Sequence, residues 1–111
     1  MISQISPKTI FFILLISAIL LEVIGDIFFK KYALDSKKAL MIIGLVFYFL
    51  GSLLWAISLK YETLSKAGTI FMVMNIILIT LVGALYFKED LSLINKLGIV
   101  LGALSIIFIE L

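Results

Sequence analysis

Two carboxylates, Glu22 and Asp26, stand four residues apart inside an apolar stretch of the chain, and Lys30 follows four residues later. In a helix this spacing places all three side chains on one face. An ionised carboxylate in hydrocarbon is costly unless a cation, water or strong hydrogen bonds satisfy it, and otherwise it takes up a proton. A group with that choice can exchange a proton for a cation, so Glu22 is the first candidate for chemistry.

Each of the two acids also has a structural interpretation. Glu22 can be a packing residue whose carboxylate is satisfied by a neighbouring hydroxyl or by Lys30, although we favour a functional role because acids inside membranes are usually functional. Asp26 lies nearer the membrane edge, and we favour an ion pair with Lys30, since the acid precedes the base at a favourable spacing. The alternative is that Asp26 is a second site carboxylate, which would suit a substrate with two positive charges.

Four further residues are candidates for the binding site. Asn75 is the only amide in the third apolar stretch and must find a hydrogen-bond partner on another helix, so packing and substrate contact both remain open. Phe71 precedes it by four residues and shares its face. Tyr48 and Ser52 form a similar same-face pair in the second stretch, where the tyrosine can offer a hydroxyl to Glu22 or a ring face to a cation.

The composition restricts the class of protein. Of 111 residues, 64% are hydrophobic and 14% are charged, and the mean hydropathy is +1.31. A soluble domain of this size cannot bury such an excess of apolar residues. The chain has no cysteine or histidine, and its net charge is +2. We therefore expect an integral membrane protein that is not an enzyme, with no cofactor, no metal site and no nucleic-acid partner.

The elements that position these residues are predicted from the apolar stretches. A spanning helix needs about 20 apolar residues. The chain is expected to be all-α, a single four-helix transmembrane domain over residues 1–111, with spans at about 10–29, 39–59, 67–87 and 91–109. In the fourth span Gly98 and Gly102 form a pair of small residues that Ser105 extends, and such a surface allows close helix contact.

The first span resembles the first helix of the small multidrug resistance family, within the drug/metabolite transporter superfamily. The residues that carry the resemblance are Ala18, Glu22, Val23, Ile24, Gly25 and Lys30. Tyr48 stands where the family has a tyrosine in its second helix, and Gly98 and Ser105 stand where it has two glycines for dimer packing. The third span departs from the family pattern: Phe71 replaces a tryptophan, and Asn75 replaces a glycine.

The resemblance implies an antiparallel dimer with a shared chamber, in which two Glu22 carboxylates bind either protons or a cationic substrate. The expected function is proton-coupled export of small organic cations, such as quaternary ammonium, guanidinium or polyamine-like compounds, from a prokaryotic cell across its plasma (inner) membrane. One alternative is a flippase-type subunit that moves a lipid-linked or amphipathic substrate, also as a heterodimer. Another is a proton-relaying subunit of an energy-coupling complex.

The lysines give a moderate orientation bias. A side with more lysine tends to be cytoplasmic, which predicts that the first and third loops are inside and both termini outside. Six lysines fall on that side and three on the other: Lys30, Lys31, Lys37, Lys38, Lys88 and Lys96 against Lys8, Lys60 and Lys66. An antiparallel homodimer requires insertion in both directions, so this bias leaves open a related chain as the partner, although we favour the homodimer.

Overall fold

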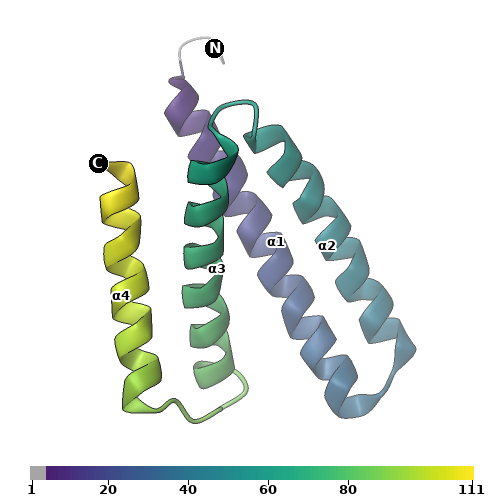
Figure 1. Cartoon of the computed structure of the whole chain (residues 1–111). Coiled ribbons are helices and arrows are strands. Elements are labelled where there is room, and N and C mark those ends of the chain that lie inside the picture. The colour runs from purple at the N-terminus through teal and green to yellow at the C-terminus, as the bar shows by residue number, and fades with distance from the viewer. Residues whose placement is uncertain (1–4) are drawn as a thin grey trace. The chain divides into compact units, whose positions relative to one another are not determined.

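A computed structural model describes residues 5–111 and contains four α-helices, which Figure 1 shows with their connections. All four helices are long and apolar enough to cross a membrane. The prediction of an all-helical, four-span protein is therefore confirmed. The helices are α1 (Pro7–Asp35), α2 (Lys38–Ser58), α3 (Leu64–Leu85) and α4 (Leu93–Glu110).

The helix ends differ from the predicted spans because capping residues, rather than hydropathy, decide where a helix begins. The Ser6 side chain accepts a hydrogen bond from the Thr9 amide at 3.2 Å, and Pro7 occupies the first turn, so α1 begins three residues before the predicted span. At the other end α1 continues past the apolar stretch and stops at Ser36, which is left-handed at φ 58°. The helix therefore outlasts its apolar stretch by one to two turns.

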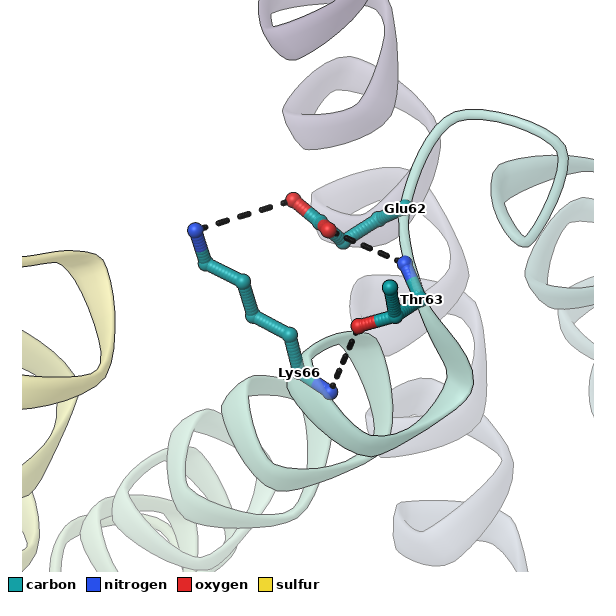
Figure 2. Close-up of polar contacts among 3 residues, drawn as sticks. All are labelled: Glu62, Thr63 and Lys66. Carbon is teal, nitrogen blue, oxygen red and sulfur yellow. Dashed lines mark hydrogen bonds and ion pairs between the residues drawn. The ribbon is translucent and has the colours of Figure 1, made fainter.

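The start of α3 is held by a small polar cluster, which Figure 2 shows. The Thr63 hydroxyl accepts a hydrogen bond from the Lys66 amide at 3.3 Å, and the Glu62 carboxylate accepts one from the Thr63 amide at 2.9 Å. The Lys66 ammonium lies 3.8 Å from the second Glu62 oxygen. These contacts satisfy free amides of the first turn, so α3 starts at Leu64, three residues before the predicted span.

The described chain divides into two compact parts, one ending at Ala67 and one comprising Gly68–Leu111. In the first part α1 and α2 run antiparallel and pack closely along their lengths (Figure 1). The contact is made through small residues. A methyl group at Gly25 would lie 3.0 Å from the Gly44 carbonyl oxygen, and one at Gly51 would lie 3.0 Å from the Ala18 carbonyl oxygen. Backbone therefore meets backbone at two levels, about two turns apart.

Aromatic rings fill the space beside these glycine contacts. Phe29 stacks on Tyr48 with ring centroids 5.1 Å apart, and Phe28 stacks on Phe47 at 5.7 Å. Such offset pairs contribute roughly 0.5–1.5 kcal/mol each beyond their buried area. They join the C-terminal half of α1 to the middle of α2, which fixes the register of the helix pair at the level of Asp26.

The second part contains most of α3 and all of α4. A methyl group at Gly102 would lie 3.4 Å from Cγ1 of Val73, so this turn of α4 lies next to α3. No residue of α4 is buried, and Leu93, Ile94 and Phe108 are 82%, 79% and 72% exposed. Apolar side chains at this exposure require lipid or another protein around them.

Candidate functional site

Glu22 is a half-buried residue of α1 whose side chain lies against the backbone of α2. A methyl group added at Gly51 would lie only 2.8 Å from Cγ of Glu22. The contact exists because Gly51 has no side chain at the point where the two helices come closest. The Glu22 side chain is thus packed into the α1–α2 contact.

Asp26 lies one turn further along α1 and is engaged by the second helix. The Tyr48 hydroxyl donates a hydrogen bond to Oδ1 of Asp26. The other carboxylate oxygen, Oδ2, is buried and has no hydrogen-bond partner among the described residues. A buried acceptor of this kind is costly unless a proton or a cation satisfies it. The ion pair of Asp26 with Lys30 stays a prediction.

The direction in which helical side chains lean explains why Tyr48 bonds to Asp26 rather than to Glu22. Side chains in a helix lean toward their own N-terminus. Because α2 runs antiparallel to α1, Tyr48 leans toward the C-terminal half of α1, where Asp26 lies. Glu22 leans the other way, toward Gly51. The two carboxylates on one face of α1 therefore meet different residues of α2.

Gly51 is the contact that sequence reasoning missed. The helix face that Ser52 shares with Tyr48 predicts a site residue, but Ser52 is exposed, and its neighbour Gly51 touches Glu22. A signal was available in the spacing of small residues. Ala18 and Gly25 are seven residues apart in α1, and so are the two glycines of α2 at positions 44 and 51. This repeat predicts a close antiparallel helix pair.

Phe71 and Asn75 belong to α3, in the second part of the chain. Both are half-buried, and their spacing of four residues places them on one helix face. Oδ1 of Asn75 is buried without a hydrogen-bond partner in the described part of the chain. This free acceptor suits a donor from another chain or from a substrate. A chamber that Asn75 and Phe71 share with Glu22 stays a prediction.

The three small residues proposed for dimer contact differ in their surroundings. A methyl group at Gly98 would meet no atom of the described residues within 4 Å, so this position is open. Gly102 is in contact with Val73 of α3, and the Ser105 hydroxyl donates to the Gly102 carbonyl oxygen at 2.7 Å. Gly98 is thus the residue of the three with most room for a second helix. The dimer contact itself stays a prediction.

The arrangement therefore offers carboxylate acceptors for positive charge at two levels. Glu22 and Asp26 are half-buried on one face of a membrane-length helix, and Asp26 retains one unsatisfied oxygen. Tyr48, which stacks on Phe29, lies beside Asp26 and can present its other ring face to a cation. Such a set can bind protons or organic cations, because acceptors and ring faces both stabilise positive charge.

Two relatives with similar sequences are bacterial. The chain is 34% identical over 97 residues to the uncharacterized membrane protein YvaE of Bacillus subtilis (strain 168), covering 84% of this chain and 81% of that protein. It is 43% identical over 65 residues to ArnE of Hamiltonella defensa subsp. Acyrthosiphon pisum (strain 5AT), a probable 4-amino-4-deoxy-L-arabinose-phosphoundecaprenol flippase subunit, covering 57% of this chain and 58% of ArnE. No solved structure matches the chain.

The family model described as Small Multidrug Resistance protein matches residues 10–101. This range includes all of α2 and α3, most of α1 and the first half of α4. Proteins of this family are multi-pass transporters or flippase subunits that function as homo- or heterodimers. The match, the four membrane-length helices and the bacterial relatives agree on a protein of the plasma (inner) membrane. The chain belongs to the small multidrug resistance family.

Proposed function

We propose that this protein exports small organic cations in exchange for protons, with Glu22 as the group that binds one or the other. The observation that carries the proposal is the position of Glu22, half-buried in a membrane-length helix and packed against the backbone of α2. A carboxylate in this position is costly when it is ionised and has no cation bound, so it holds a proton or a cation. Because a proton and a cation compete for one carboxylate, the movement of protons into the cell is coupled to the movement of the cation out of it.

The other site residues have proposed roles around Glu22. Tyr48 holds Asp26 through its hydroxyl and presents its ring to a cation. Phe71 supplies a second ring, and the free oxygen of Asn75 accepts a hydrogen bond from an ammonium or guanidinium group. Ser52 is exposed on α2, and its proposed role is to contact the partner chain or the substrate.

The working unit is proposed to be an antiparallel dimer of two copies of this chain, or of this chain and a related one. A chain of 111 residues with no buried residue in α4 cannot enclose a path by itself. In the dimer the two copies of Glu22 line one chamber, and α4 forms the contact near Gly98. Alternating access then follows when one copy repacks against the other.

Transport measurements on purified protein in liposomes test this proposal. Substrate-evoked, proton-coupled currents would be recorded for wild type and Glu22→Gln with a quaternary ammonium, a guanidinium compound and a polyamine. We expect at least one compound to give currents in wild type and none in the variant, with both proteins folded and dimeric. Coupled currents that persist in Glu22→Gln would contradict the proposal.

A second candidate is a flippase-type function, which the similarity to ArnE favours. In that case the substrate is a lipid-linked or amphipathic molecule, and the protein works with a related chain. Wild-type protein would then give no current with any of the three cations although its dimer is intact. It would instead move a lipid-linked amino sugar between leaflets, measured by the access of a membrane-impermeant amine reagent.

A further inference from the structure

We infer that Gly51 is a positioning residue for Glu22: by lacking a side chain, it sets where the Glu22 carboxylate stands in the helix pair. The role of Gly51 in transport rests on the proposed function. Its effect on the position of the Glu22 side chain can be tested without any substrate. Gly51 is not among the candidate site residues, and the spacing of polar residues does not point to it.

The geometry at Gly51 carries the inference. A methyl group there would lie 2.8 Å from Cγ of Glu22 and 3.0 Å from the carbonyl oxygen of Ala18. Real side chains almost never show the first distance, so something must move. The Ala18 oxygen belongs to the backbone of a regular helix and resists displacement, whereas Glu22 can change its side-chain torsions. A methyl group at position 51 therefore acts first on the Glu22 side chain.

Gly44 provides a matched control on the same helix. A methyl group at Gly44 would also lie 3.0 Å from a backbone oxygen of α1, that of Gly25, and 2.6 Å from the ring of Phe29. Both glycines are buried in the α1–α2 contact, seven residues apart. Only Gly51 touches Glu22. The substitutions Gly51→Ala and Gly44→Ala thus disturb the same interface to a similar extent, and they differ in whether they press on the carboxylate.

The first measurement follows the titration of Glu22 by carbon NMR on protein with labelled glutamate. The Glu22 signal is identified by its loss in Glu22→Gln, since the chain has only three other glutamates, Glu62, Glu89 and Glu110. Within the described α1–α2 pair, the titratable groups that act on Glu22 are Asp26 on its own helix and Tyr48 on α2, and neither residue is substituted. We expect Gly51→Ala to shift the titration midpoint by about half a pH unit or more, and Gly44→Ala to leave it in place. Equal midpoints in all three proteins, or equal shifts in both variants, would overturn the inference.

Transport then separates this inference from the proposed function. If wild type exchanges protons for a cation, Gly51→Ala should lower apparent substrate affinity about tenfold or more, because small misplacements of a binding group have large effects. Gly44→Ala should retain wild-type affinity even where both variants lose thermal stability. The proposed function fails if Glu22→Gln transports normally, whatever Gly51→Ala does. The positioning role fails if Gly51→Ala and Gly44→Ala have the same apparent substrate affinity while Glu22→Gln is inactive.

Discussion

The Tyr48 hydroxyl is bonded to Asp26, not to Glu22, although both acids lie on the same face of α1. The bond joins the middle of α2 to the C-terminal half of α1. It leaves Glu22 without this hydroxyl and in contact with Gly51 instead. The two carboxylates therefore have different environments, and substitutions at them should have different effects.

Loss of the Tyr48 hydroxyl should destabilise the helix pair. In Tyr48→Phe the ring still stacks on Phe29, but Asp26 loses its only described hydrogen bond while one of its oxygens is already unpartnered. We expect a loss of about 1–3 kcal/mol in the free energy of unfolding, measured by denaturant titration in detergent. Tyr61→Phe, at an exposed position, is the control and should be near wild type. Equal stability of the two variants would contradict the importance of the bond.

Asp26→Asn should preserve coupled transport of singly charged cations, in contrast to Glu22→Gln. The amide keeps an oxygen that accepts the Tyr48 hydrogen bond, and it removes the charge from the buried position. Proteoliposome currents with a quaternary ammonium compound measure the outcome. Complete loss of the currents in Asp26→Asn would show that Glu22 is not sufficient for coupling. A selective loss of diamine binding would identify Asp26 as the second site carboxylate.

Gly25→Ala should weaken the packing of α1 on α2. Its methyl group would lie 2.6 Å from Cδ2 of Tyr48 and 3.0 Å from the Gly44 oxygen, and neither a stacked ring nor a helix backbone yields easily. Overpacking of this kind costs about 1–3 kcal/mol, which thermal unfolding in detergent would detect. Gly68→Ala is the control, because a methyl group there meets no described atom within 4 Å. That variant should be as stable as wild type or slightly more stable.

A larger side chain at Gly98 should impair dimer formation without disturbing the fold of one chain. The position is open within the described residues and lies on a helix that buries none of its side chains. For Gly98→Leu we expect about a tenfold weaker dimer, measured by sedimentation at several protein-to-detergent ratios. Gly68→Leu, equally open but on α3, should dimerise normally. If Gly98→Leu also dimerises normally, the contact lies elsewhere.

The four helices could be predicted from hydropathy because each apolar stretch is long enough to span a bilayer. Their ends could not be placed to the residue, because Ser6 and Thr63 begin helices outside the apolar stretches. The acids and Tyr48 could be identified from type and spacing, since same-face relationships follow from a single helix. The partner of each acid depends on the register between two helices, which hydropathy does not contain.

Close packing of α1 on α2 has a consequence for how the protein is made. Of the four helices, α1 leaves the ribosome before the other three and carries Glu22 and Asp26 into the bilayer. Entry of α2 then brings Tyr48 to Asp26 and the bare backbone at Gly51 to Glu22, and neither contact needs α3 or α4. Each acid therefore meets its contact on α2 within the first hairpin, while Oδ2 of Asp26 still has no hydrogen-bond partner among the described residues.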